Sequence, residues 1–116
     1  MQPEAAKYLE DVRQACRLLQ DFTVGKSFAD YLADPLLRAG VEREFILIGE
    51  ALFQASRKDA TIGQSIAMLP QIIGFRNILV HGYATIQHQT VWGVVQNDLT
   101  PLKQEVEKLL AQAGPP

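Results

Sequence analysis

The chain has little of several features that would define its class. Its 116 residues include one cysteine, Cys16, so no disulfide can form within the chain. Cys16 lies on an apolar stripe, which predicts a buried thiol rather than a reactive one. The chain has two histidines and lacks both HExxH and CxxC spacing, so metal catalysis has poor support and we expect neither a metal nor another cofactor.

Long apolar runs are also lacking, and none approaches the roughly 20 residues needed to span a bilayer. The N-terminal segment MQPEAAKYLEDVR carries charges throughout and has no signal-peptide core. A cytoplasmic protein without membrane contact is therefore expected. The chain also lacks a large excess of charge of either sign, since 11 basic and 13 acidic residues give a net charge of −2. Because nucleic-acid-binding domains are usually basic, any RNA contact must be local or shared between subunits.

Strand-like alternation and hairpin turns are absent, and apolar residues instead repeat every three or four positions. The length fits one domain, assigned to residues 1–116, and the composition of 47% hydrophobic and 21% charged residues is ordinary for a globular protein. Amphipathic helices joined by short loops pack most naturally as a bundle. The predicted fold class is therefore all-α, an antiparallel bundle of four to five helices.

The helix boundaries follow from capping and helix-breaking residues. Asp34 before Pro35 is typical of an N-cap with proline at the first helical position, and Gly82 is a natural helix stop. Pro101 falls inside the apolar pattern of the last helix, which predicts either a kink near Val95–Leu99 or two abutting helices. The expected helices cover residues 4–23, 35–58, 70–82 and 91–109. The sequence also predicts one or two turns in 26–34, a loop with or without a helical turn over 59–69, and a frayed tail at 113–116.

The segment GFRNILVHGY, residues 74–83, holds the side chains best suited to chemistry. On a helix, Asn77 and His81 lie one turn apart on the same face, whereas Arg76 is about 140° away from His81. Arg76 and His81 can converge only on a ligand or partner that lies across the helix, or where the helix loosens at Gly82. His81 is also near a helix C-terminus, where the dipole favours the imidazolium and repels an anion.

Two interpretations of this segment remain open from the residues alone. In the functional one, His81 takes a proton from an RNA 2′-hydroxyl or gives one to the leaving oxygen, and Arg76 donates paired hydrogen bonds to the phosphate. In the structural one, Arg76 makes a surface ion pair, while His81 and Tyr83 finish a helix end. Spacing by itself favours the structural interpretation, because R-x4-H is a loose pattern.

Residues 76–83, RNILVHGY, resemble the R-x4-H-x-Y motif of HepT-like proteins, a branch of the HEPN superfamily. The likeness extends along the chain. Residues 41–43 (VER) and 46–51 (ILIGEA) are similar to the family's second long helix, and Trp92 with residues 97–102 (NDLTPL) is similar to its last helix. The motif together with the ILIGEA segment is specific, although R-x4-H alone is not.

The resemblance implies a helical homodimer whose two motifs face one cleft, which would relieve the poor convergence of Arg76 and His81. It also implies a metal-independent endoribonuclease in which Arg76 and His81 are catalytic and Asn77 supports them. The resemblance further implies that the protein is the toxin of a type VII-like toxin–antitoxin system, and that an MntA-like minimal nucleotidyltransferase uses ATP to adenylylate Tyr83 and so silence it. The alternative is a non-catalytic HEPN module that binds nucleotide or serves as partner or substrate of a nucleotidyltransferase.

Overall fold

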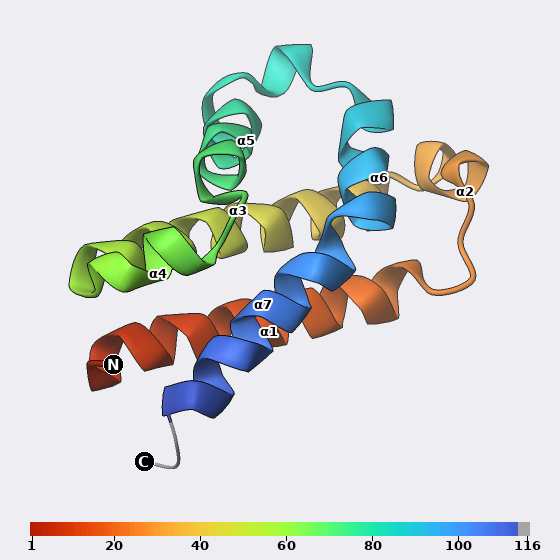
Figure 1. Cartoon of the computed structure of the whole chain (residues 1–116). Coiled ribbons are helices and arrows are strands. Elements are labelled where there is room, and N and C mark those ends of the chain that lie inside the picture. The colour runs from red at the N-terminus through yellow and green to blue at the C-terminus, as the bar shows by residue number, and fades with distance from the viewer. Residues whose placement is uncertain (114–116) are drawn as a thin grey trace.

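The structure is a computed structural model that describes residues 1–113, in which all regular secondary structure is helical (Figure 1). Five α-helices have ten or more residues and two have six, so the predicted all-α bundle is confirmed. In chain order the elements are α1 (Pro3–Thr23), α2 (Phe28–Ala33), α3 (Pro35–Lys58), α4 (Ala60–Ser65), α5 (Leu69–His81), the 3₁₀ helix η1 (Tyr83–Thr85), α6 (His88–Asn97) and α7 (Leu99–Ala113).

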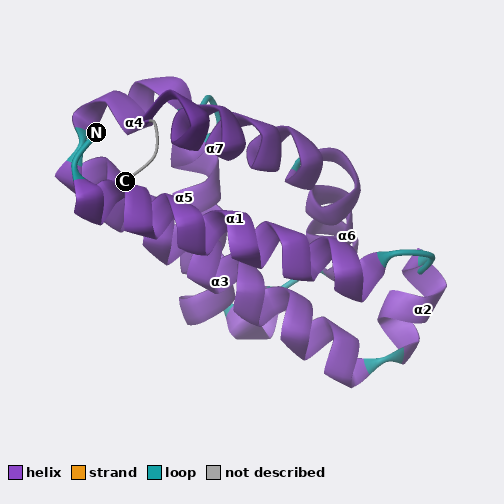
Figure 2. Cartoon of the chain, turned by 90° about the horizontal axis from the view of Figure 1, so that it is seen from below, coloured by secondary structure: helices purple, strands orange, loops and turns teal. Residues whose placement is uncertain are grey.

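The two long helices α1 and α3 run antiparallel, side by side (Figure 1, Figure 2). Their apolar stripes face one another, with Leu9 and Val12 of α1 and Ile48 and Leu52 of α3 at most 1% exposed. α5 packs on α3 and α7 packs on α1, so these helices share one hydrophobic core. Cys16 is buried on the α1 stripe as predicted, and burial raises the pKa of its thiol to about 12.

The start of α3 and the end of α5 lie at the capping residues that the sequence predicted. The Asp34 carboxylate accepts hydrogen bonds of 3.1 Å from the backbone N–H groups of Leu36 and Leu37, and Pro35 opens α3. These bonds satisfy donors that have no partner inside the helix. α5 ends at His81, and Gly82 donates its N–H to the Ile78 carbonyl at 2.8 Å.

The stretch 59–69, which was expected to be a loop, is more helical than its sequence indicates, because α4 occupies six of its residues. The Asp59 carboxylate caps α4 by accepting a hydrogen bond of 3.0 Å from the Thr61 N–H. Ile62 and Ile66 are completely buried and anchor this segment to the core. Tertiary burial therefore stabilises a helix that has too few residues to form by itself.

The last helical region is two abutting helices, the second of the two predicted alternatives. Asp98 separates α6 from α7, and Pro101 lies in the first turn of α7, where a missing N–H costs no helical hydrogen bond. Leu99 and Leu102, which flank the break, are buried. Ala113 still belongs to α7, and the rest of the tail predicted to fray, 114–116, lies outside the described residues. None of the helices in residues 1–113 has the length and apolarity to cross a membrane.

Candidate active site

The four predicted site residues all lie on α5 or directly after it. Arg76 and Asn77 are in the middle of the helix, His81 is its last residue, and Tyr83 begins η1 after the cap at Gly82. Figure 1 shows α5 rising from α3, with the segment that contains η1 arching from its end towards α6. This arrangement places the exposed end of the motif at one extremity of the fold.

Arg76 is held by two acceptors. Its Nη2 lies 2.7 Å from a carboxylate oxygen of Glu50 on α3, and its Nη1 donates a 2.9 Å hydrogen bond to the Asn77 side-chain oxygen. Its Nε is buried and has no acceptor among the described residues. The ion pair expected from the structural interpretation of Arg76 is therefore present, and it joins two helices.

Gly49 allows α5 to approach α3 closely at this point. A Cβ atom on Gly49 would lie 2.4 Å from the Arg76 Cβ and 2.8 Å from its Cγ, which is closer than such atoms approach in proteins. Because a Cβ is not the flexible end of a side chain, the helices would have to separate. The missing side chain at Gly49 therefore determines how deep the stem of Arg76 lies.

His81 and Tyr83 differ from Arg76 in being free of such contacts. Both are exposed, Tyr83 to 77%, and neither side chain has a hydrogen-bond partner within residues 1–113. A hydrogen bond joins Arg76 to Asn77, but within the described residues no hydrogen bond or ion pair joins either of them to His81. This agrees with the angular separation of Arg76 and His81 expected on one helix, and the roles of all four residues stay predictions.

Two hollows of the surface meet at Arg76. One, of about 280 Å³, is lined by α3 and α5 residues that include Phe53, Ile73 and Asn77. The other, of about 370 Å³, lies between α1 and α3 and includes Tyr8 and Arg43. Arg76 and Glu50 line both. A third hollow, of about 220 Å³, is strongly apolar and contains none of the four motif side chains, so we do not assign chemistry to it.

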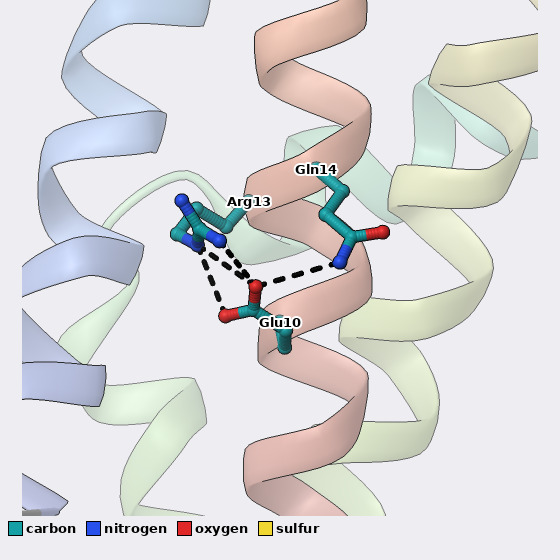
Figure 3. A network of polar contacts seen from close by, with 3 residues as sticks. All are labelled: Glu10, Arg13 and Gln14. Atoms are coloured by element: carbon teal, nitrogen blue, oxygen red, sulfur yellow. Dashed lines mark hydrogen bonds and ion pairs between the residues drawn. The ribbon is translucent and has the colours of Figure 1, made fainter.

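A second polar cluster in the described residues lies on a single helix. Figure 3 shows it, with Glu10 accepting hydrogen bonds from Arg13 and Gln14. The bonds from Arg13 lower the pKa of Glu10, but all three residues lie on α1, and no hydrogen bond or ion pair within residues 1–113 joins them to a second helix. Residues 1–113 also contain no group of three or more His, Cys, Asp or Glu placed to hold a metal ion. The Arg76–Glu50 pair is different because it lies at a helix crossing beside two hollows.

Sequence reasoning assigned no role to Glu50. A signal was present, since Gly49 lies inside a long predicted helix, where glycine is unfavourable by about 1 kcal/mol relative to alanine and often marks a close approach. That signal locates a crossing point on α3. It does not identify Arg76 as the residue on the other side, because the contact depends on how α5 lies on α3.

The fold places the chain among the all-α helical bundles, and the arginine–histidine segment of α5 supplies a candidate active site. The family model described as Ribonuclease HepT-like matches residues 12–109. The chain therefore belongs to the HepT-like family, and the resemblance identified from the sequence is confirmed.

Relatives with assigned names agree with this membership. A Thermococcus cleftensis protein named "Probable ribonuclease HepT" is 30% identical over 102 residues, which cover 88% of this chain and 92% of the relative. A Caldanaerobacter subterraneus subsp. tengcongensis protein named "Putative RNase TTE0752" is 29% identical over 103 residues, which cover 89% and 91%. No solved structure matches the chain.

Proposed function

We propose that the protein is a metal-independent endoribonuclease and the toxin of a type VII-like toxin–antitoxin system, acting in the cytoplasm as a homodimer. Membership in a ribonuclease family is the observation that carries the proposal. The state of the motif supports it, because Arg76 is held in place while His81 is free to meet a substrate. The net charge of −2 fits a nuclease that recognises a particular RNA by shape and a few phosphate contacts.

In the proposed reaction, one His81 imidazole takes the proton of a ribose 2′-hydroxyl, and the 2′-oxygen attacks the adjacent phosphorus. The P–O5′ bond breaks as the new bond forms, which leaves a 2′,3′-cyclic phosphate and a 5′-hydroxyl. A protonated His81 from the second subunit gives its proton to the leaving 5′-oxygen. Arg76 donates hydrogen bonds to the phosphate oxygens, where negative charge increases in the transition state.

The proposed dimer forms through α5. Only Leu69 and Leu79 of this apolar helix are buried in the chain, while Ile78 is 53% exposed. A second copy that covers this face would remove apolar surface from water and bring two motifs together by two-fold symmetry. The one cleft of the dimer would then hold two His81 and two Arg76 side chains, so that Arg76 and His81 need not converge within a single chain.

We expect His81→Ala to remove RNA cleavage without unfolding the protein. General acid–base catalysis contributes roughly 10²–10⁴ in rate, so cleavage should fall at least that far while the helical circular dichroism signal stays the same. His88→Gln, which removes the other imidazole of the chain, is the matched control and should keep its activity. Each protein is assayed in EDTA and, in parallel, in Mg²⁺ without EDTA. Cleavage that requires Mg²⁺, or that persists in His81→Ala, would contradict the mechanism.

Tyr83 is the proposed site of silencing. Its exposed hydroxyl can attack the α-phosphorus of ATP in the partner nucleotidyltransferase, forming an O–P bond as pyrophosphate leaves. The added phosphodiester would compete with RNA for Arg76 and block the cleft. Incubation with the nucleotidyltransferase and ATP should add an AMP mass to the wild type and to Tyr8→Phe, but not to Tyr83→Phe, which should stay active. An AMP mass on Tyr83→Phe would overturn the assignment.

The alternative function is a non-catalytic module that presents Tyr83 or a nucleotide to a nucleotidyltransferase. The exposure of Tyr83 is compatible with this function as well. Assays of the wild-type protein distinguish the two functions. A protein that is adenylylated on Tyr83 but cleaves no RNA, over a broad set of cellular RNAs, would be the module and not the nuclease.

A further inference from the structure

The Glu50 carboxylate lies against the motif arginine yet takes no part in the proton transfers proposed above. We propose that Glu50 is a positioning residue for Arg76: it holds the guanidinium in one orientation at the crossing of α3 and α5, so that the remaining donors face the scissile phosphate. The inference rests on the proposed ribonuclease function. It assigns a role to Glu50 of the ILIGEA segment, which lies outside the R-x4-H-x-Y motif.

The guanidinium has five N–H donors in a fixed plane. Glu50 occupies one on Nη2 at 2.7 Å, and Asn77 occupies one on Nη1 at 2.9 Å. The Nε donor is buried and has no acceptor in the described part of the chain. The two donors that remain are on Nη1 and Nη2. Because the guanidinium is a rigid plane, contacts at two of its nitrogens limit its rotation, so Glu50 and Asn77 together determine where these free donors point.

The stem of Arg76 is restrained separately. Its Cβ and Cγ lie so close to the α3 backbone at Gly49 that even a methyl group there would overlap them. The rotations that remain are those near the guanidinium itself. Glu50 is the next residue along α3 and reaches this end of the side chain from the other helix. One turn of α3 therefore restrains the stem through Gly49 and the charged head through Glu50.

The pair is too exposed to act mainly on stability. The Arg76 side chain is 27% exposed and the Glu50 side chain 46%, and ion pairs at such sites contribute little to folding. The Glu50 carboxylate should also weaken RNA binding, because its negative charge repels the phosphate that Arg76 must bind. A positioning role therefore predicts a split in the kinetic constants, in which loss of Glu50 lowers kcat while KM for RNA stays the same or falls.

The kinetic test compares three variants with the wild type in EDTA. Glu50→Ala should lower kcat about 10- to 100-fold, in line with the cost of misplacing a reacting group. Glu50→Gln keeps an oxygen that can accept from Nη2 and should recover part of that loss. Glu44→Gln, on the same helix and with no ion pair in the described structure, should match the wild type. An unchanged kcat in Glu50→Ala, or a rise in kcat, would overturn the inference.

A second measurement does not depend on cleavage. In ¹⁵N NMR spectra of the arginine side chains, Arg76 of the wild type should show slow rotation of its guanidinium, and Glu50→Ala should lose this restriction. Arg17, which is exposed, serves as the internal reference in both samples. If the wild type cleaves no RNA, the nuclease proposal fails while this experiment still tests the positioning role. An Arg76 signal equally restricted in both proteins would refute that role.

Discussion

At the scale of single residues, the site depends on a missing atom as much as on charged groups. Gly49 has no Cβ, and the stem of Arg76 occupies the space that a Cβ would take. Arg76 can then reach Glu50 on the same turn of α3. A glycine in a helix interior costs stability through backbone entropy. In this position it permits the crossing that brings the arginine and the glutamate together.

Gly49→Ala should therefore destabilise the protein, although alanine is the better helix former. The added methyl group would force α5 away from α3, and overpacking of this kind costs typically 1–3 kcal/mol. Gly93→Ala in α6 is the matched control, because a Cβ there meets nothing within 4 Å and should stabilise the protein by about 0.4–1 kcal/mol. Urea unfolding of both variants measures the difference. Two variants of equal stability would show that the crossing adjusts at no cost.

At the scale of elements, the break between α6 and α7 shapes the C-terminal part of the core. Asp98 closes α6 by donating its N–H to the Val94 carbonyl at 2.9 Å, and its own carbonyl accepts from the Leu102 N–H at 3.1 Å in the first turn of α7. Pro101 can follow so closely because a first-turn residue needs no donor. The break turns α7 along α1, where Val106 is completely buried.

Leu102→Ala should test whether this face of α7 belongs to the core. Leu102 is 7% exposed, and truncation of a buried leucine costs about 2–5 kcal/mol. Since one side of Leu102 borders the apolar hollow, we expect a value near the lower end. Gln104→Ala, at an exposed position of the same helix, should change the free energy of unfolding by less than about 0.5 kcal/mol. An unchanged melting temperature with lost activity in Leu102→Ala would mean that this face binds a ligand.

At the scale of the whole molecule, α5 is the helix whose composition fits its surroundings least. It is the most apolar of the longer helices, yet most of its residues are exposed or half-buried. α1, by contrast, buries a complete stripe from Ala5 to Thr23. A helix that is apolar on more faces than the fold covers is expected to meet another molecule. In the proposed dimer, the second copy would cover this surface.

Ile78→Glu should convert the proposed dimer to a monomer. The change places a charge on the exposed apolar part of α5, where burial in an interface without a partner would be costly. Leu36→Glu is the matched control, because Leu36 is 83% exposed compared with 53% for Ile78 and lies at the first turn of α3. Sedimentation equilibrium should give a dimer for the wild type and for Leu36→Glu, and a monomer for Ile78→Glu. A monomeric wild type would contradict the dimer, and a dimeric Ile78→Glu would place its interface elsewhere.

The sequence by itself determined the long helices, the helix ends at Asp34 and Gly82, and the family. Asp34 and Gly82 mark helix ends through bonds to residues within four positions, so nothing distant is needed to predict them. The repeat of apolar residues identified the buried faces for the same reason, and Cys16 was assigned to the core from it. The motif from Arg76 to Tyr83 is likewise a continuous stretch, which is why the resemblance could be identified before any fold was known.

The tertiary structure alone decided which residues meet Arg76 and which short segments become helical. Glu50 pairs with Arg76 because α5 crosses α3 at Gly49, and the position of that crossing depends on the packing of the whole bundle. α4 forms over a stretch without clear periodicity because the core covers Ile62 and Ile66. Both results come from contacts between residues far apart in the chain, whose free energy is gained only when the helices have assembled.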